Sequence, residues 1–560
     1  MKSKILLALC AVVSMSAHGV PRSEKEALQE AASFFRSNPS VRRAAGTSTA
    51  LKYAYSAVQA NGEAAFYVFN RGENEGFVMV SAESNTPTII GYSETGRFDP
   101  EDLPVGLQAW MEEYKEEIAR AGESAHAYAP QAGGYTPVAP LCTTQWGQGT
   151  PYNNLCPYYT DKRAVTGCVA TAAAQIMKYH SYPEQGIGSH SYKWANANGD
   201  SVQLSADFGS TTYDWTHMID SYDESATETQ TNAVATLMSH CGIAVEMDYG
   251  SSNSSADSRD MNQALIERFG YDKGIRHLLK DYMGTDMLMS AISYDLQHGR
   301  PVYISAKTID NGGHAFICDG IDSDGLLHIN WGWKGKSDGY YLLSLFNPKD
   351  QGTGGSASKK AYTEKIGIYM NIRPDEGGNY VHSLVCDNIR PGQEAYHRDS
   401  SIVIYIDTLR NEGFMPWEGN LSMGVLKDGQ SYKSRRISST ANPLKEGMFR
   451  KRLNYRASFA NRETYPEGEY AIVLGVWDVK DENTFVTIYR KWVGQWRCNL
   501  TITSDSIYLT PPVIVVPGAE QGIEAPVVKP ERPAAQKYIR DGQLFILKGE
   551  DIYDFKGQRL

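Results

Sequence analysis

The chain has 560 residues, more than one hydrophobic core accommodates, which predicts three or four folded units. Its hydrophobic content of 41% and aromatic content of 11% are those of a globular protein. The net charge of −11 argues against nucleic acid as a partner and against adhesion to anionic membranes. A multidomain globular protein that binds neither is the class that remains.

The N-terminal segment 1–19 has the pattern of a secretory signal peptide. Lys2 and Lys4 precede an apolar run at residues 5–13, and small residues follow. The apolar run is too short for a membrane span, and no later segment approaches eighteen apolar residues. We therefore expect a secreted protein with no membrane span.

Residues 20–134 have the pattern of a separate small unit. A helix is predicted at residues 103–121, because Leu107, Trp110, Met111 and Tyr114 fall on one side of it. The stretch 121–140 is rich in Ala, Gly, Pro and Ser, which predicts an exposed linker. Three short strands bounded by turn residues are predicted before the helix, at 65–69, 77–80 and 88–92.

Cys168 stands at the start of a predicted amphipathic helix, residues 168–180, with Thr166 and Gly167 as its entry. Unpaired N–H groups and the positive end of the helix dipole favour a thiolate at this position. A thiolate attacks carbonyl groups, so Cys168 is the candidate nucleophile, although a buried structural cysteine is a common alternative. The buried face is predicted from Val169, Ala172, Ala173, Ile176 and Met177.

His314 is the candidate general base among twelve histidines. Two glycines precede it and a strand-like run follows it, so backbone can approach closely beside the imidazole. His180 shares the helix of Cys168 but lies roughly 18 Å further along the axis at 1.5 Å per residue. His328, two residues before Asn330 on one face of a strand, suits a supporting role.

Asn330 and Trp331 are the candidate partners of His314. The turn at residues 322–325 predicts a hairpin that brings Asn330 beside the histidine. Its amide oxygen would accept the Nδ1–H and fix the tautomer, and Trp331 would cover that bond. The order Cys168, His314, Asn330 fits papain-like proteases.

Gln148 is the candidate donor to an oxyanion, together with the N–H of Cys168. It lies between two glycines upstream of the helix, and a tetrahedral intermediate needs such donors. A polar turn residue is the competing interpretation.

The cysteines left after removal of a signal peptide number seven, and export would permit disulfides. Cys142 and Cys156 are near enough in sequence to pair, and Cys386 with Cys498 could staple the C-terminal region, although the sequence leaves the connectivity open. No spacing resembles a metal site, so neither a metal nor another cofactor is expected.

Beyond about residue 373 the pattern changes to period-two runs with glycine-rich turns, which predicts an immunoglobulin-like β-sandwich at residues 379–510. Of adhesion, stabilisation and spacing, spacing is the preferred role. A Pro-rich extended linker is expected at 511–535. The tail, 536–560, resembles the sorting segments of Por-type secretion. The predicted strands are 401–406, 421–426, 470–476 and 485–489.

Five motifs together resemble the streptopain family of secreted cysteine proteases, over residues 51 to about 373. The resemblance implies an α+β fold with a papain-like catalytic domain at 135–373, an N-terminal strand-and-helix prosegment and the predicted sandwich. It gives Cys168, His314, Asn330, Trp331 and Gln148 the roles assigned above. The motifs are Gln-Gly-Thr-Pro-Tyr-Asn, Thr-Gly-Cys-Val-Ala-Thr-Ala, Gln-Ile-Met-Lys-Tyr-His, Gly-Gly-His-Ala-Phe and Asn-Trp-Gly-Trp.

The segment 248–256 resembles the family's substrate-side loop, which makes Ser254, Ser255 and Ala256 candidate substrate-binding residues. The resemblance also implies a hydrophobic pocket for the residue two before the cleaved bond. The expected partners are protein and peptide substrates and the protein's own prosegment as an inhibitor.

The predicted function is that of a secreted cysteine endopeptidase made as a zymogen, outside the cell or in the periplasm or on the surface of a bacterium. Two alternatives stay open. One is a thiol acyltransferase or amidase, and the other is a non-catalytic binding protein on a papain-like scaffold. Asn330-Trp331 favours the protease over the first, and the filled catalytic positions argue against the second.

Overall fold

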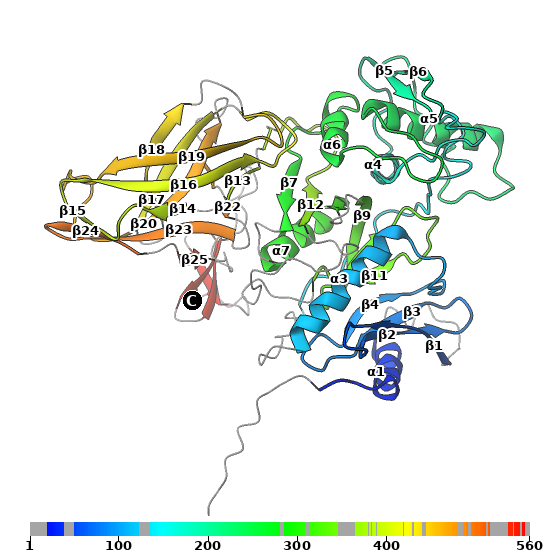
Figure 1. Ribbon diagram of the computed structural model, residues 1–560, viewed down its shortest axis with the longest axis horizontal. Helices are drawn as coiled ribbons and strands as arrows, with labels where there is room; N and C mark the ends of the chain where they lie inside the picture. The colour runs from blue at the N-terminus through cyan, green and yellow to red at the C-terminus, as the bar shows by residue number, and fades with distance from the viewer. Residues whose placement is uncertain are drawn as a thin grey trace, which may run out of the picture. The chain divides into compact units, whose positions relative to one another are not determined.

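The computed structural model divides the chain into two compact units, residues 1–100 with 114–132, and residues 101–113 with 133–560 (Figure 1). The structure describes residues 20–38, 50–122, 134–280, 285–307, 313–344 and 364–554, the last range without 379, 382, 388, 418, 428–429, 440–443, 479–484, 488, 491–493, 511–512, 516–535, 541–542 and 549–550. The predicted signal peptide lies outside the described residues, as does most of the predicted linker at 121–140.

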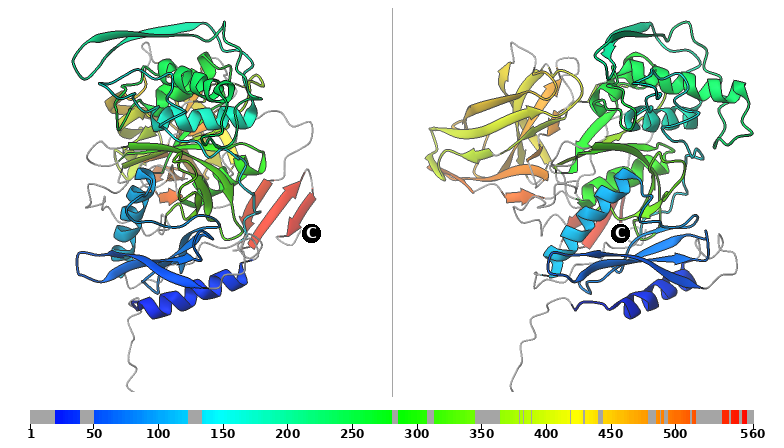
Figure 2. Two further views of the ribbon diagram at one scale, coloured as in Figure 1. Left: turned by 90° about the vertical axis from the view of Figure 1, so that its right-hand side faces the viewer. Right: turned by 45° about the vertical axis from the view of Figure 1, so that its right-hand side comes forward.

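The first unit is an antiparallel sheet in the order β1-β2-β3-β4 with helix α1 on one face (Figures 1 and 2). The strands predicted at 65–69, 77–80 and 88–92 are confirmed, but α1 and β1 were not predicted. The signal for α1 is the capping box of Ser23 and Glu26, which satisfies two N–H groups at its start. The bounds are α1 Glu24–Ser37, β1 Leu51–Val58, β2 Ala64–Arg71, β3 Phe77–Ser81 and β4 Ile89–Ser93.

The predicted helix at 103–121 is confirmed as α3, Val105–Gly122. Its residues up to Glu113 belong to the second unit, and its later residues belong to the first. Within the first unit, Tyr114 donates a hydrogen bond to the carbonyl oxygen of Ile90 at 2.9 Å.

The second unit begins with a helical region and an antiparallel sheet in which strands pair in the order β11-β10-β9-β8-β12-β7. The predicted helix at 168–180 and the predicted hairpin of β9 and β10 are both confirmed. The helices are α4 Cys168–His180, α5 Glu228–Ala244, α6 Ser258–Glu267 and α7 Thr285–Gln297. The strands are β5 Ser189–Ala195, β6 Ser201–Asp207, β7 Arg276–Leu279, β8 Val302–Lys307, β9 Gly313–Ile321, β10 Leu327–Asn330, β11 Gly339–Tyr341 and β12 Glu364–Met370.

Helix α4 is the centre of this region. It is buried from Val169 to Met177, and it packs against both α5 and β9 (Figures 1 and 2). The alanines that give the helix a thin profile allow this close packing on two sides. The first residue of the helix is thereby fixed beside strand β9, which carries His314.

Residues 384–509 form a second strand-rich region with its own core. In β16, Ile402, Ile404 and Ile406 are buried while alternate residues face outward, as the period-two pattern predicts. The strands are β13 Leu384–Cys386, β14 Ile389–Pro391, β15 Ala395–His397, β16 Ser401–Asn411, β17 Gly419–Lys427, β18 Gln430–Ser439, β19 Phe449–Ser458, β20 Gly468–Asp478, β21 Phe485–Thr487, β22 Tyr489–Arg490, β23 Gly494–Ile502 and β24 Ser506–Leu509.

Two features near the C-terminus refine the predictions. Inside the predicted linker at 511–535, β25 (Val513–Val515) pairs with β23, so this part of the stretch belongs to the sheet. The tail forms a small antiparallel sheet of β26 (Gln536–Arg540), β27 (Gln543–Lys548) and β28 (Asp551–Asp554). Among the described residues, no helix has the length and apolar character needed to cross a membrane.

The predicted disulfides are wrong, because Cys142, Cys156, Cys386 and Cys498 are all free and buried in the structure. The sequence proximity of the first two is misleading. The backbone N–H of Cys142 is held by Asp319 of strand β9 at 2.9 Å, whereas the thiol of Cys156 lies against Tyr249. The two cysteines therefore pack in different surroundings.

Candidate active site

Cys168 is the first residue of α4, and the backbone at Gly167 explains how the chain reaches it. Gly167 has a φ of 84°, and a Cβ there would lie 2.9 Å from the Met247 side chain and 3.1 Å from the carbonyl oxygen of Ser254. Glycine is therefore required on both conformational and steric grounds. No side chain caps the helix at Gly167, so the half-buried thiol lies at its uncapped start.

The environment of Cys168 favours its ionised form. Burial raises the pKa of the Cys168 thiol, but the charge of His314 and a hydrogen bond with that ring outweigh it. Hydrogen bonds from backbone N–H groups, including that of Val169 in the first helical turn, add to this effect. The net result is a pKa below the ordinary value, as the position at the helix start predicts.

His314 is the second residue of β9. It pairs with Ala306 of β8 and is buried. Its Nε2 lies 3.1 Å from the carbonyl oxygen of Trp331, so Nε2 carries the proton and Nδ1 is left for Cys168. Burial lowers the pKa of His314, but the thiolate of Cys168 and these hydrogen bonds outweigh burial and raise it. The opposite shifts of thiol and imidazole are those of an ion pair.

The predicted hydrogen bond from Nδ1 of His314 to the Asn330 amide oxygen is wrong in both partners. The ring bonds through Nε2, and its acceptor is the carbonyl oxygen of Trp331. The Asn330 Oδ1 accepts from the N–H of Gly332 at 2.9 Å and from Nε2 of Gln175 at 3.2 Å. Its Nδ2 donates to the carbonyl oxygen of Thr144 at 2.7 Å. The hairpin therefore brings the Asn330–Trp331 segment to the histidine, but presents a main-chain carbonyl to the ring.

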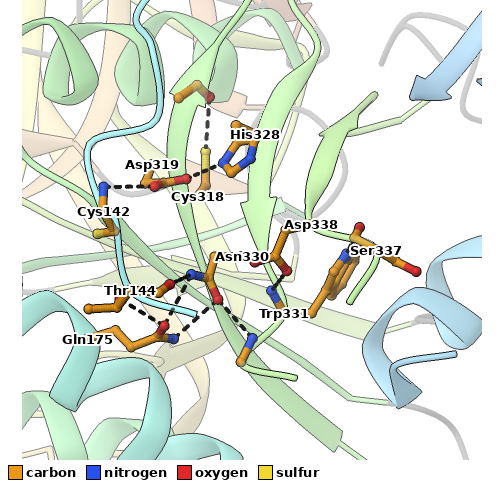
Figure 3. Close-up of polar contacts among 12 residues, drawn as sticks. Cys142, Thr144, Gln175, Cys318, Asp319, His328, Asn330, Trp331, Ser337 and Asp338 are labelled. Atoms are coloured by element: carbon orange, nitrogen blue, oxygen red, sulfur yellow. Dashed lines mark hydrogen bonds and ion pairs between the residues drawn. The ribbon is translucent and has the colours of Figure 1, made fainter. Parts of the chain in front are cut away.

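Gln175 is the residue at this site that the sequence analysis missed. It is fully buried, and its amide faces that of Asn330 (Figure 3). Its Oε1 also accepts from the hydroxyl of Thr144 at 2.9 Å and from the N–H of Trp146 at 3.3 Å. The available signal was a lone amide on the small and apolar buried face of α4, seven residues after Cys168.

Trp331 is buried, and its Nε1 donates to the carbonyl oxygen of Ser337 at 3.1 Å (Figure 3). Its N–H donates to Asp338 Oδ1 at 2.9 Å, and its ring packs against Phe316 with centroids 4.8 Å apart. These contacts hold the residue whose carbonyl oxygen meets His314.

Gln148 lies beside the approach to the nucleophile. Its carbonyl oxygen accepts from the N–H of Thr166 at 3.0 Å, two residues before Cys168. No hydrogen bond joins its half-buried side-chain amide to another residue in the part of the chain that the structure describes. The amide is thus available to a ligand.

The loop at residues 248–256, predicted to face substrate, lies against the segment just before Cys168. Ser254 is buried, and its hydroxyl donates to the carbonyl oxygen of Val165 at 2.7 Å. Asp248 and Ser255 pair as an antiparallel bridge, and Ala256 packs on the main core. The Ser254 hydroxyl therefore fixes the loop to the segment before Cys168.

The two rival histidines have other partners. His180 Nδ1 lies 3.2 Å from the hydroxyl of Tyr271, and His328 Nδ1 lies 2.6 Å from Asp319 Oδ1 (Figure 3). Among the described residues, no group of three or more His, Cys, Asp or Glu side chains is arranged to hold a metal ion.

The start of α3 packs directly on the candidate base within the second unit. A Cβ at Gly106 would lie 2.5 Å from Cδ2 of His314 and 2.7 Å from the Trp331 ring. Trp110 packs edge-on against Trp331 with centroids 6.0 Å apart and donates to the carbonyl oxygen of Leu342 at 3.1 Å.

Two ion pairs flank this contact. The buried ammonium of Lys280 lies 2.7 Å from Glu113, and Lys336 pairs with Asp102 at a more exposed position. Residues 102–113 are thus joined to the region of His314 by apolar packing and by charge.

Comparison with known proteins agrees with this geometry. Residues 146–341 match the Peptidase C10 family, and residues 20–118 match the Spi protease inhibitor. The chain is 35% identical to streptopain of Streptococcus pyogenes over 60% of its length and 88% of that protein. The chain belongs to the streptopain family of cysteine peptidases.

Two further relatives are similar to this chain. The thiol protease/hemagglutinin PrtT of Porphyromonas gingivalis is 32% identical over 66% of this chain and 43% of that protein. A solved fragment of Prevotella intermedia prointerpain A is 35% identical, with 57% of this chain and 98% of that chain covered and a TM-score of 0.49. The protein is thus a cysteine peptidase of α+β class with a propeptide-like inhibitor domain.

Proposed function

We propose that this protein is a secreted cysteine endopeptidase, made as a zymogen, in which Cys168 is the nucleophile and His314 the general base. The observation that carries the proposal is the hydrogen-bonded pair of Cys168 and His314, with a lowered thiol pKa and a raised imidazole pKa. Both shifts favour a thiolate–imidazolium pair near neutral pH.

In the first half of the reaction, the Cys168 thiolate adds to the substrate carbonyl carbon and forms a C–S bond. The oxyanion accepts hydrogen bonds from the Cys168 N–H and from the Gln148 amide. The imidazolium of His314 then protonates the amine as the C–N bond breaks, which leaves a thioester. In the second half, His314 takes a proton from water, the hydroxide adds to the thioester, and the acid leaves as Cys168 regains the thiolate.

Trp331 and Asn330 support this chemistry from behind the histidine. The Trp331 carbonyl oxygen fixes the ring through Nε2, and we assign the buried Trp331 indole to covering that bond. We place Ser254, Ser255 and Ala256 at the substrate, in a loop tied to the residues before Cys168. A hydrophobic residue two before the cleaved bond is the expected preference, which peptide-library profiling tests.

The zymogen proposal rests on the inhibitor-like match of residues 20–118 and on the contact of Gly106 and Trp110 with His314 and Trp331. The start of α3 thereby covers the buried ring of the candidate base. Purified wild-type protein should shorten to a form beginning between about residues 121 and 140, while Cys168→Ala stays full length. Maturation of Cys168→Ala at the same bond would assign the cutting to another protease.

The proposed organisation is a signal peptide at 1–19, a prosegment at 20–134, the catalytic domain at 135–373 and an immunoglobulin-like sandwich at 379–510. A linker at 511–535, of which β25 (Val513–Val515) belongs to the sheet, and a sorting tail at 536–560 follow. The antiparallel strands and separate core of residues 384–509 support the sandwich. Export to the cell surface, periplasm or medium rests on the pattern of residues 1–19.

The deciding experiment is titration of the processed protein with an epoxide-type thiol-protease inhibitor, with peptide hydrolysis measured in parallel. One mole of label per mole at Cys168 and loss of hydrolysis in proportion are the expected results. Labelling without any peptide hydrolysis would favour the acyltransferase or amidase, and no labelling would favour a binding protein.

A further inference from the structure

The carbonyl oxygen that accepts from His314 belongs to a peptide group whose N–H is also hydrogen-bonded. The carbonyl oxygen of Trp331 and the N–H of Gly332 belong to the same planar peptide bond. His314 Nε2 donates to the first at 3.1 Å, and Asn330 Oδ1 accepts from the second at 2.9 Å. Asn330 therefore holds the plane that fixes the histidine ring, without touching the ring.

Gln175 determines which way the Asn330 amide points. Gln175 Oε1 accepts from the N–H of Trp146, and Asn330 Nδ2 donates to the carbonyl oxygen of Thr144. Both partners are main-chain groups with only one possible role, so neither amide can be reversed without losing a buried hydrogen bond. In this orientation Gln175 Nε2 donates to Asn330 Oδ1 at 3.2 Å, which leaves that oxygen aimed at Gly332 (Figure 3).

Gln175 also shares a helix with the nucleophile. It follows Cys168 by seven residues, close to two turns, so both lie on one side of α4. Gly332 packs on the same helix, since a Cβ there would lie 3.2 Å from Thr171 and 3.8 Å from Gln175 Nε2. One rigid helix thus carries both the thiol and the group that locates the acceptor of the base.

We propose that Gln175 is a positioning residue for catalysis, acting through Asn330 and the Trp331–Gly332 peptide on the orientation of His314. The inference rests on the proposed roles of Cys168 and His314. In this proposal the Asn330 side chain holds the Trp331–Gly332 peptide group, in place of the direct contact with His314 that its position in the motif predicts. The Gln175–Asn330 amide pair sets the angle of the imidazole relative to the thiol.

The main test is Gln175→Met in the processed enzyme. It keeps the length of the side chain and removes both hydrogen bonds with Asn330, together with those from the Thr144 hydroxyl and the Trp146 N–H. The value of kcat should fall on the order of 10–100-fold with KM little changed, because the base is misaligned while substrate contacts remain. The alkylation rate of Cys168 by iodoacetamide, measured against pH, should show its thiol inflection at higher pH. Wild-type kcat and an unshifted inflection in folded Gln175→Met would overturn the proposal.

Thr144→Val is the matched control. It removes a buried hydroxyl from the same Gln175 Oε1 but leaves the amide pair in place. It should lose part of the thermal stability that Gln175→Met loses, and retain nearly full kcat and the wild-type alkylation profile. An equal loss of kcat in this control would mean that Gln175 only supports folding, and would overturn the proposal.

Two further variants close the test. Asn330→Ala and the double variant with Gln175→Met should lose about the same kcat, because both break one chain of contacts, whereas additive losses would overturn the proposal. Gln175→Glu keeps an acceptor and, when its buried carboxyl is protonated, a donor, so its kcat should recover relative to wild type as pH falls. A kcat of Gln175→Glu that does not recover at low pH would count against the proposal. This result decides the question even if Gln175→Met fails to fold. Hydrolysis by Cys168→Ala would refute the proposed function instead.

Discussion

Two cysteine–histidine clusters form around the β9–β10 hairpin, and the electrostatic surroundings of their thiols are opposite. In the reactive cluster, Cys168, His314 and Trp331, the thiol faces an imidazole held by a neutral main-chain carbonyl. In the Asp319 cluster, Cys142, Cys318, Asp319 and His328, the imidazole is bound to a buried carboxylate (Figure 3).

The pKa values follow from this difference. Burial and then the charge of Asp319 raise the pKa of Cys142 and of Cys318 well above the ordinary value. Burial also acts on Cys168, but the imidazolium of His314 reverses its effect. A histidine and a cysteine close together are therefore not enough for a nucleophile. The charge nearest the sulfur decides which thiol ionises.

The largest expected effect separates the two histidines. His314→Ala should lower kcat/KM for peptide hydrolysis on the order of 10⁴-fold or more, and Cys168→Ala should abolish hydrolysis. His328→Ala should keep most of the activity of the folded protein, because its ring bonds Asp319. Circular dichroism confirms folding in each variant. A folded, inactive His328→Ala beside an active His314→Ala would reverse the comparison.

Gln148 should be the next most sensitive position of the reactive cluster. Gln148→Ala should lower kcat by about 10²–10³-fold, the effect of losing one oxyanion donor. Its main-chain bond to Thr166 survives the change, so the helix entry should stay intact. Steady-state kinetics measures the loss, and Gln145→Ala, at an exposed nearby glutamine, is the control. An unchanged rate would remove Gln148 from the site.

The pH dependence should report the reactive cluster alone. Activity should rise as pH passes the lowered pKa of Cys168 and fall as pH passes the raised pKa of His314, by up to tenfold per pH unit on each side. Alkylation at neutral pH followed by peptide mapping should modify Cys168 and leave Cys142 and Cys318 unmodified. Equal labelling of all three would show that the two clusters do not differ as described.

Asp338 should affect stability and have the least effect on activity. Burial raises the pKa of Asp338 to about 7, against the hydrogen bond from Trp331 and the charge of His328. The folded state thus favours the neutral acid, so stability is present below the unfolded pKa and is lost as pH rises from about 4 to 7.

Asp338→Asn keeps an oxygen for the Trp331 N–H and removes this titration. The free energy of unfolding of Asp338→Asn should increase relative to that of the parent as pH rises, with a difference on the order of a few kcal/mol at pH 7. Urea unfolding in a Cys168→Ala background measures this without self-digestion. Parallel pH profiles for the two proteins would contradict the raised pKa.

Local patterns were sufficient for the elements that carry the reactive cluster. The spacing of small and apolar residues gave α4 its bounds, and the turn at 322–325 gave the hairpin, where Asp322 Oδ1 accepts from the N–H groups of Asp324 and Leu326. Helix α1 was missed because its evidence is a capping box at Ser23 and only three buried residues. The disulfide predictions failed because sequence proximity says nothing about which way a thiol is packed.

The sequence by itself determined which residues are the candidates for the chemistry, because a cysteine at a helix start and a histidine after two glycines are local arrangements. Only the tertiary structure decided how they are held. The acceptor of His314 is a main-chain carbonyl of Trp331, and the Asn330 amide is taken by Gln175 and Thr144. Those partners come from three distant segments, and every main-chain carbonyl looks the same in a sequence, so only their meeting in the fold reveals the acceptor.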